Sequence, residues 1–317
     1  MSVEDLRHIL NEITQNPHLR DKAGIKATYD KVGPNVSLPE TYPYGAEVML
    51  GDDCTAIPDG ANGHLLFASE GIISAFLERD PWFAGYCSVM VNISDVLAMG
   101  GLPIAVTDVI WGEDKGSLDK IWEGMVAASV AYDVPIVGGH TCYRSPTKAL
   151  AVSILGRAQE LLSSFNARPD QHLLMAVDMK ADYYRDYPFW NASTHSSSDR
   201  LRANLTIMQE IANRGLCSAA KDISMGGLLG TVAMLGNTSE VGFDLYFDQI
   251  IPAPDGDWYR WLIAFPSFGF VLTCDSKHVA EVRDLFDQRD IRCDSIGLVR
   301  ETQGINLWKN DSSIKFL

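Results

Sequence analysis

The sequence has 317 residues, of which 46% are hydrophobic and 21% are charged, and its formal net charge at pH 7 is −15. These values fit a soluble globular protein with one large domain or two medium ones. So acidic a chain disfavours non-specific nucleic-acid binding, which needs Lys and Arg against phosphates, and it disfavours docking on anionic membranes. A strongly acidic protein that binds anionic phosphates usually needs a metal ion that bridges its carboxylates and the phosphates.

The six cysteines are widely scattered and form no Cys-x-x-Cys pair, so neither a zinc knuckle nor a redox dithiol is indicated. Dispersed cysteines are typical of reduced, mostly buried thiols in a cytoplasmic protein. No apolar run approaches the length that spans a bilayer, and the N-terminal segment lacks the basic start and apolar core of a signal peptide. We therefore expect a soluble, cytoplasmic protein.

The first elements are a short helix and a long lead-in, which together form the segment 1–45. Residues 3–15 place apolar side chains at helical spacing, which predicts a surface helix. Residues 16–45 contain several Pro and Gly with little periodicity, which predicts an extended or mobile lead-in. Lys22 and Lys26 in this lead-in are candidates to close over phosphates, or else solvated surface side chains.

A first domain is expected over residues 46–158. Its predicted elements are a helix at 118–132 and strands at 65–69, 104–110, 135–137 and 149–155. Strands that alternate with helices indicate an α/β or α+β layer architecture.

A second domain is expected over residues 159–317. Its predicted elements are helices at 200–214 and 227–235, and strands at 173–177, 243–247, 269–273 and 295–299. Residues 181–200 have no clear period, which predicts a long loop.

The first candidate site is Gly51-Asp52-Asp53, two carboxylates at a glycine-permitted turn between strand-like segments. Magnesium takes hard oxygen ligands, usually one or two carboxylates with phosphate oxygens and water. Gly-Asp-Asp is also ordinary turn chemistry, so a solvated turn stays open as the alternative.

The second candidate site lies in the apolar segment 89–99, which predicts a helix that ends at Gly100-Gly101. Asn92 and Asp95 are three residues apart and share one face of that helix. Buried polar groups are costly without partners, so these two indicate either a metal or phosphate site or a buried hydrogen bond.

Three further motifs carry polar residues and glycines, two of them at the ends of predicted strands and one before a predicted helix. Glu70 ends the strand at 65–69, and Gly138-Gly139-His140-Thr141 end the strand at 135–137. Paired glycines let the backbone approach a phosphate. His140 could be a metal ligand, a proton-transfer group or a capped polar residue. Asp222, Ser224 and two glycines precede the helix at 227–235. They could form an anion-binding site at the start of this helix, or they could be an ordinary N-cap.

Several common catalytic motifs are missing from the sequence. It contains no Gly-x-x-x-x-Gly-Lys-[Ser/Thr] loop, no Gly-x-Gly-x-x-Gly after a strand and no Gly-x-Ser-x-Gly elbow. It also lacks the His-Glu-x-x-His zinc motif. P-loop, dinucleotide, serine-nucleophile and zinc-hydrolase chemistry are therefore disfavoured.

Taken in order, five motifs over about residues 46–245 resemble the aminoimidazole ribonucleotide synthetase superfamily. Its members include thiamine-monophosphate kinase, selenophosphate synthetase and the hydrogenase-maturation carbamoyl dehydratase. The matching segments are residues 51–57, 69–71, 91–103, 137–141 and 222–228.

The resemblance implies two α/β domains, with the N-terminal sheet pairing across a homodimer and ATP with magnesium in a cleft between the domains. By matching position, the implied metal ligands are Asp52, Asp53, Glu70, Asp95 and Asp222. The same match implies nucleotide contacts by Asn92, Gly138, Gly139, Thr141 and Ser224, and catalytic roles for Asp52, Asp95, His140 and Asp222.

The chain departs from the family pattern at several of these positions. Glu70 stands where the family usually has Asp, and His140 where it usually has Asp or Glu. Met225 replaces a residue that is often polar, and residues 264–273 lack the Gly-x-Asp-Tyr-Glu-Leu type of segment found in thiamine-monophosphate kinase. These departures indicate a divergent subfamily with a different substrate.

The leading hypothesis is an ATP- and magnesium-dependent enzyme that transfers phosphate to a small molecule or activates its oxygen as a phosphate. An ATP-dependent cyclo-ligase or amidine-forming enzyme is the competing enzyme hypothesis. A non-catalytic nucleotide-binding regulatory protein is the alternative from another class, kept open by His140 and Met225.

Overall fold

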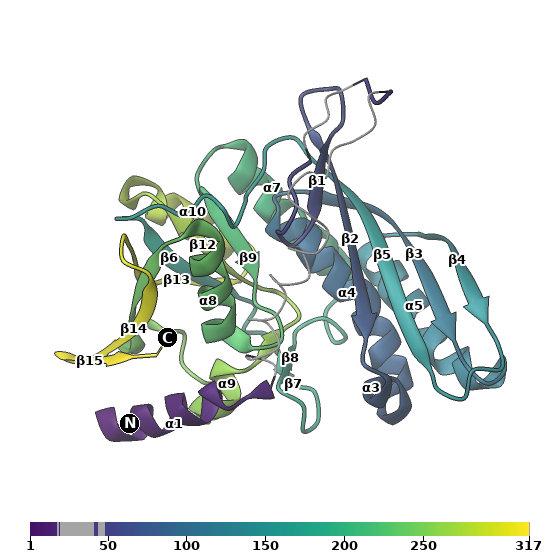
Figure 1. Cartoon of the computed structure of the whole chain (residues 1–317), viewed down its shortest axis with the longest axis horizontal. Coiled ribbons are helices and arrows are strands. Elements are labelled where there is room, and N and C mark those ends of the chain that lie inside the picture. The colour runs from purple at the N-terminus through teal and green to yellow at the C-terminus, as the bar shows by residue number, and fades with distance from the viewer. Residues whose placement is uncertain (18, 20–40, 44–47, 317) are drawn as a thin grey trace. The chain divides into compact units, whose positions relative to one another are not determined.

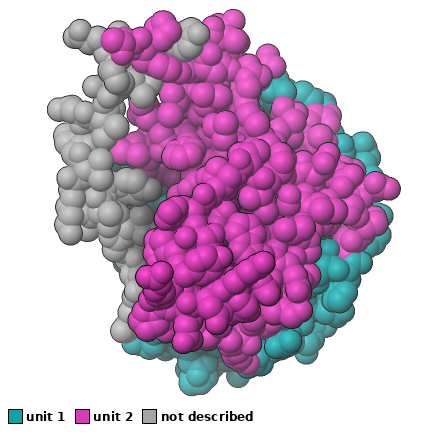
Figure 2. Space-filling model, turned by 90° about the vertical axis from the view of Figure 1, so that its right-hand side faces the viewer, with its two compact units in different colours: residues 1–36, 162–195, 211–317 teal, residues 37–161, 196–210 magenta. Residues whose placement is uncertain are grey.

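The computed structural model describes residues 1–17, 19, 41–43 and 48–316. Most of the expected lead-in, including Lys22 and Lys26, lies outside these described residues. The chain divides into two compact units, drawn in teal and magenta in Figure 2. Unit 1 comprises Met1–Val36, Leu162–His195 and Ile211–Leu317, and unit 2 comprises Ser37–Leu161 and Ser196–Glu210.

Unit 2 contains a five-stranded mixed sheet with the strand order β1-β2-β5-β3-β4. Its strands are β1 (Thr55–Pro58), β2 (His64–Ile72), β3 (Leu102–Trp111), β4 (Ile136–Cys142) and β5 (Ala149–Ala158). Its helices are α3 (Ser74–Arg79), α4 (Pro81–Ala98), η1 (Gly116–Leu118), α5 (Asp119–Tyr132) and α6 (Ser198–Asn204). Helix α4 packs against β2, β5 and β3, and α5 packs against α4 (Figure 1).

Helix α4 is the central element of unit 2 and is buried along almost its whole length. Its apolar run Phe83–Ala98 leaves little polar surface, as expected for a helix enclosed by other elements. It ends at Ala98, and Gly100 follows with a left-handed φ of 75°, which only glycine adopts readily. The helix predicted to end at Gly100-Gly101 is therefore confirmed.

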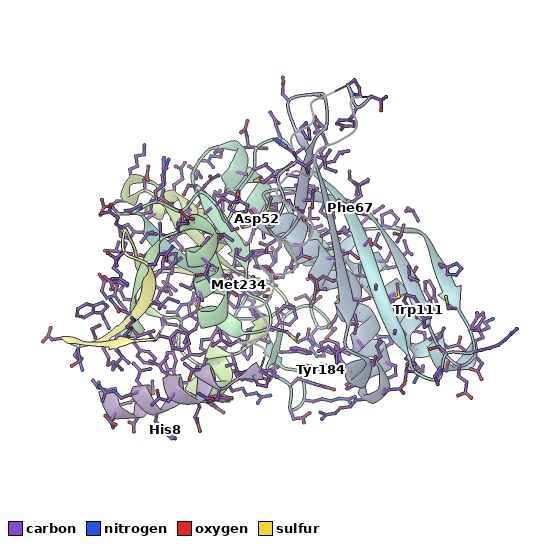
Figure 3. The ribbon with its side chains drawn as sticks, in the orientation of Figure 1. His8, Asp52, Phe67, Trp111, Tyr184 and Met234 are labelled. Atoms are coloured by element: carbon purple, nitrogen blue, oxygen red, sulfur yellow. The ribbon has the colours of Figure 1, made fainter. Side chains whose placement is uncertain are left out.

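The face of the unit 2 sheet opposite to the buried one carries exposed apolar side chains. Phe67 on β2, labelled in Figure 3, is 50% exposed and lies directly across from Leu155 on β5, which is 37% exposed. Ile104 on β3 and Val137 on β4 are also exposed, at 45% and 64%. Isolated exposed apolar residues are common, but four on neighbouring strands of one sheet form an apolar surface.

Unit 1 contains a seven-stranded sheet with the order β15-β14-β10-β13-β6-β12-β9, and a small sheet with the order β11-β8-β7. The large sheet is formed by β6 (His172–Val177), β9 (Ala219–Asp222), β10 (Gly242–Tyr246), β12 (Gly269–Cys274), β13 (Arg292–Arg300), β14 (Gly304–Lys309) and β15 (Ser312–Lys315). The small sheet is formed by β7 (Asp182–Tyr183), β8 (Phe189–Asn191) and β11 (Phe265–Pro266).

The helices of unit 1 are α1 (Val3–Thr14), α8 (Gly227–Ser239), η2 (Phe247–Gln249), α9 (Trp258–Leu262), η3 (Ser276–His278) and α10 (Val279–Asp287), and α7 (Thr206–Asn213) crosses the division between the units. Of these, α1, α8, η2 and α9 enclose an apolar core with the large sheet, and α10 packs against β13. Helix α1 begins with a capping box between Ser2 and Asp5 and buries Leu6, Leu10 and Ile13 in this core. The helix predicted over residues 3–15 is confirmed.

Three predictions of local structure are wrong. The helix expected over 200–214 is two helices, α6 and α7, which meet at Leu205. Residues 181–200, expected as a loop, contain β7 and β8 and the start of α6. Gly138-Gly139-His140-Thr141 lie within strand β4 and not after its end, because β4 extends to Cys142 along β3.

No helix within the described ranges is both long and apolar enough to cross a membrane. All six cysteines are free thiols, and five of them are buried, as the sequence predicted.

Candidate functional site

The Gly51-Asp52-Asp53 turn is closed by a backbone bridge between Met49 and Ala56, with N–H to O distances of 3.1 and 3.0 Å. Gly51 has a φ of 99°, so a residue with a side chain would be strained at this point of the turn. Asp52 is buried, and its Oδ1 accepts a hydrogen bond from the Asp53 N–H at 3.0 Å. The turn therefore uses the carboxylate of Asp52 to fix the backbone that presents Asp53.

Asn92 and Asp95 lie one turn apart on helix α4 and are both buried. The Asn92 amide nitrogen donates to the Ser88 carbonyl at 2.8 Å, so this part of the side chain is held by its own helix. Asn92 Oδ1 is buried and has no hydrogen-bond partner in the part of the chain that the structure describes. It remains an acceptor for a ligand or for water.

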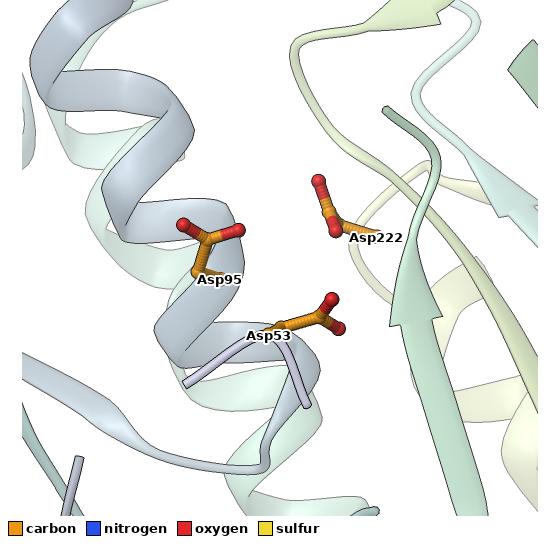
Figure 4. Close-up of side chains that lie close together, drawn as sticks. All are labelled: Asp53, Asp95 and Asp222. Atoms are coloured by element: carbon orange, nitrogen blue, oxygen red, sulfur yellow. The ribbon is translucent and has the colours of Figure 1, made fainter. Parts of the chain in front are cut away.

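Unit 2 brings Asp53 and Asp95 together although they are far apart in sequence. Each offers a carboxylate oxygen, and these oxygens lie within 4.8 Å of each other, from the turn and from α4 (Figure 4). Two carboxylates this close repel each other unless a cation or a proton lies between them. Hard oxygen donors at this spacing suit a magnesium ion that keeps further positions for phosphate or water. The donor set fits the metal that the sequence predicted.

Asp222, the third residue in Figure 4, belongs to unit 1, where it ends strand β9 and is buried. Gly226, with a φ of 111°, begins helix α8 without a side-chain cap, and the Ser224 N–H donates to Thr231 Oγ1 at 3.4 Å. The predicted helix after Asp222, Ser224 and the two glycines is confirmed as local structure, and the strand β9 before them was not predicted.

The other residues singled out in the sequence lie on the strands of the unit 2 sheet. Glu70 is exposed on β2 and is not among the described acidic side chains that cluster with Asp53 and Asp95. His140 is exposed on the edge strand β4. Because it follows Gly139, which pairs with the buried Asp108, His140 points to the opposite face of the sheet.

Asp108 on β3 is a buried carboxyl group that the sequence analysis missed. It is 3% exposed, and neither of its oxygens has a hydrogen-bond partner among residues 48–316. This burial raises the pKa of Asp108 to about 6. A Cβ on Gly139 would lie 2.2 Å from Asp108 Oδ1, so Gly139 provides the room that this carboxyl occupies. The sequence around Asp108 is typical of a strand with β-branched residues, and nothing in it indicated that the carboxyl group is buried.

Two family descriptions match the chain. Residues 51–158 match the description "AIR synthase related protein, N-terminal domain", and residues 174–310 match "AIR synthase related protein, C-terminal domain".

Several relatives are similar in sequence, and three of them illustrate the range. An uncharacterized protein of Synechocystis sp. is 41% identical over 83% of this chain and 82% of its own length. One of Methanocaldococcus jannaschii is 32% identical over 93% of this chain and 91% of its own length. A thiamine-monophosphate kinase of Synechococcus elongatus is 30% identical over 40% of each chain.

Solved structures share the fold, among them those of PurL and AaThiL. PurL of T. maritima complexed with ADP has a TM-score of 0.71 and 18% identity, over 84% of this chain and 45% of PurL. Its complex with ATP has a TM-score of 0.69. AaThiL complexed with AMPPCP and TMP has a TM-score of 0.67 and 16% identity, over 92% of this chain and 96% of that one. The chain thus spans less than half of PurL, and at these identities the likeness is one of fold.

Proposed function

Since the chain belongs to the AIR synthase related proteins, we propose that it is an ATP- and magnesium-dependent enzyme that phosphorylates a small molecule or activates its oxygen as a phosphate. The observation that carries this proposal is the approach of the Asp53 and Asp95 carboxylates. Solved complexes of PurL with ATP and of AaThiL with AMPPCP support nucleotide as the ligand.

In this proposal Asp53 and Asp95 hold the metal ion, and Asp52 keeps Asp53 in position through its hydrogen bond to the turn. Magnesium, when bound, neutralises negative charge on the phosphates, so that positioning and electrostatics supply most of the rate. Asn92 Oδ1 offers a buried acceptor one helical turn away from Asp95. A chain with a net charge of −15 needs such a cation to receive a nucleoside triphosphate.

The remaining site residues enter the proposal through the sequence motifs. We assign Asp222 as a further metal ligand and catalytic residue, and Ser224 as a phosphate contact at the start of helix α8. Glu70, Gly138, Gly139, Thr141 and His140 are assigned to the same nucleotide site on the same ground. The exposure of His140 also supports a second role, at a contact with another copy of the chain.

Replacement of Asp95 by Asn tests the metal site. We expect Asp95→Asn to weaken magnesium-dependent ATP binding by at least about tenfold, the loss that even outer-shell metal partners produce. Isothermal titration with ATP, in magnesium and in a chelator, measures this effect.

Asp133→Asn is the matched control for that titration. Asp133 is exposed at the end of α5 with a φ of 58°, a conformation that Asn also adopts. The affinity of the Asp133→Asn variant for ATP should therefore equal that of the wild type. Equal ATP affinities for the wild type and Asp95→Asn, with both proteins folded, would remove Asp95 from the site.

A second candidate function is ATP-driven ring closure or amidine formation, which the similarity to PurL supports. Both reactions release ADP, but only phosphotransfer leaves the phosphate on the product. Mass spectrometry of the product formed from candidate acceptors separates the two. Binding of ATP without any ADP release would favour the non-catalytic regulatory protein.

We also propose that the chain forms a homodimer in the cytoplasm. The apolar surface formed by Phe67, Ile104, Val137 and Leu155 supports a second copy as its occupant, because apolar surface exposed on neighbouring strands gains free energy on burial. Six cysteines without a disulfide are consistent with a reducing compartment.

A further inference from the structure

Unit 1 contains a cavity of about 450 Å³ that none of the nucleotide-site residues lines. Its walls come from η2, α9, α10 and β13, and from the segment between η2 and α9. We call it the arginine pocket and define it by Phe247, Ile250, Pro252, Trp258, Arg283 and Arg292. Its volume lies within the range of about 300–1,000 Å³ that is common for small-molecule sites.

One wall of the arginine pocket is aromatic and apolar. The rings of Phe247 and Trp258 lie 4.3 Å apart between centroids with an angle of 49° between their planes. Phe247 and Ile250 are each only 3% exposed, so their positions are fixed by the core behind them. Trp258 is only partly buried and packs on Phe247, so its ring offers the accessible surface on which a flat ring can pack.

Another part of the pocket wall presents two guanidinium groups that share one carboxylate. Arg283 Nη2 lies 3.4 Å from Asp294 Oδ1, and Arg292 Nε lies 2.7 Å from Asp294 Oδ2. Arg283 Nε also donates to the Cys293 carbonyl at 3.0 Å, which holds this side chain against β13. Asp294 therefore places the two positive charges side by side and neutralises only one of them.

Both arginines keep N–H donors that make no hydrogen bond to the described protein. These donors include the two N–H groups on Arg283 Nη1. They also include the four N–H groups on Arg292 Nη1 and Nη2. Arginine presents such donors in a planar fork that matches the oxygens of a phosphate or carboxylate. Asp248, the other acidic lining residue, is paired with Lys309, so the lining and this lysine together carry one excess positive charge, which favours an anion in a chain with a net charge of −15.

We propose that the arginine pocket binds a small organic oxyanion that carries a flat ring, with the ring against Trp258 and the anion on Arg283 and Arg292. Lys309 supports this arrangement because its ammonium lies 5.0 Å from the centre of the Phe247 ring and is paired with Asp248. The Lys309 charge is thereby paired with the Asp248 carboxylate, so the two arginines are left to bind the anionic group of the ligand.

The test uses phenyl phosphate, benzoate and inorganic phosphate as probes in isothermal titration of the full-length protein. A magnesium-free buffer with a chelator keeps the proposed nucleotide site from contributing. We expect saturable binding of phenyl phosphate or benzoate at least about tenfold tighter than that of inorganic phosphate, since the ring adds burial of apolar surface. Whichever of the two binds more tightly identifies the oxyanion as a phosphate or a carboxylate.

The double variant Arg283→Gln/Arg292→Gln should weaken binding of the preferred probe by at least about tenfold. If the double variant does not fold, the single variant Arg292→Gln replaces it in the test, and its affinity for the preferred probe should also be weaker than that of the wild type. The matched control is Arg168→Gln, whose 66% exposed side chain lies 3.9 Å from Asp275, outside the pocket. Ring-bearing probes that bind no more tightly than inorganic phosphate, or equally to the wild type and Arg292→Gln, would overturn the proposal.

Discussion

The pair Asp108 and Gly139 shows how one residue's lack of a side chain allows another's burial. The carboxyl of Asp108 occupies the space in which a Cβ of residue 139 would stand. Gly139 was interpreted from sequence as a place for close approach of a phosphate. Its position inside strand β4 gives it a second reason to be glycine, which a single sequence cannot distinguish from the first.

We expect the buried Asp108 to make stability depend on pH. Its folded pKa of about 6 lies above the usual 3.8, so the fold disfavours the ionised form. The free energy of unfolding should therefore fall as pH rises from about 4 to 6, by about 3 kcal/mol in total, and stay low above that range. Asp108→Asn should remove this loss and be more stable than the wild type at pH 7.5.

Urea denaturation of both proteins at pH 4.5 and pH 7.5 measures that difference. Asp133→Asn, at an exposed position, should follow the wild type at both values. A stability difference between Asp108→Asn and the wild type that is the same at both pH values would contradict the role of ionisation.

Sequence reasoning found Asp53 and Asp95 because each breaks a local pattern. Asp53 follows a glycine at a turn, and Asp95 is a charge in an apolar helix. That they meet could be expected only from the family resemblance, because nothing in the 41 intervening residues encodes the approach of the turn to α4. Asp108 stayed hidden because its position in an alternating strand reads equally well as a solvent-facing residue.

At the scale of elements, helices α4 and α5 approach so closely that their backbones are in contact. A Cβ on Gly85 of α4 would lie 2.1 Å from the Ile121 carbonyl oxygen of α5. A Cβ on Gly124 of α5 would lie 1.9 Å from the Trp82 carbonyl oxygen of α4. The two glycines thus set the distance between the helices, and with it the position of the helix that carries Asp95.

Gly124→Ala should destabilise the protein by about 1–3 kcal/mol, because the added methyl group must push backbone atoms apart. Thermal unfolding followed by circular dichroism checks this expectation. Gly116→Ala is the control, since the nearest atom to its new Cβ would be an Asp114 oxygen 3.6 Å away. Equal melting temperatures for the two variants would show that α4 and α5 can separate without cost.

The types of element could largely be predicted from the sequence, and their ends could not. The strong apolar periods at 118–132 and 149–155 correspond to α5 and β5. The pattern at 200–214 continues across Leu205, so it reads as one helix although the structure divides it into α6, which lies in unit 2, and α7, whose last residues belong to unit 1. Strand β4 extends past its apolar start because pairing with β3 stabilises glycines that have little strand propensity of their own.

At the scale of the whole molecule, the uncovered face of the unit 2 sheet is the feature with the largest expected consequence. Phe67→Glu should shift the proposed dimer toward monomer, because it places a charge within the apolar surface. Light scattering coupled to size-exclusion chromatography measures the mass. Val130→Glu, at a 62% exposed position on α5, should leave the mass unchanged. A monomeric wild type would contradict the dimer.

Neither compact unit is continuous in sequence, and this affects the order in which they can form during synthesis. Helix α6, whose Arg202 donates at 2.7 Å to the Val130 carbonyl near the end of α5, emerges from the ribosome only after the strand β6 and the small strands β7 and β8 of unit 1. Helix α1 precedes every element of unit 2 in the chain, yet most strands of the sheet that buries it are translated after unit 2 is complete. We therefore expect nascent chains that stop near residue 158 to hold an unfinished unit 2, and folding to be completed largely after release of the full chain.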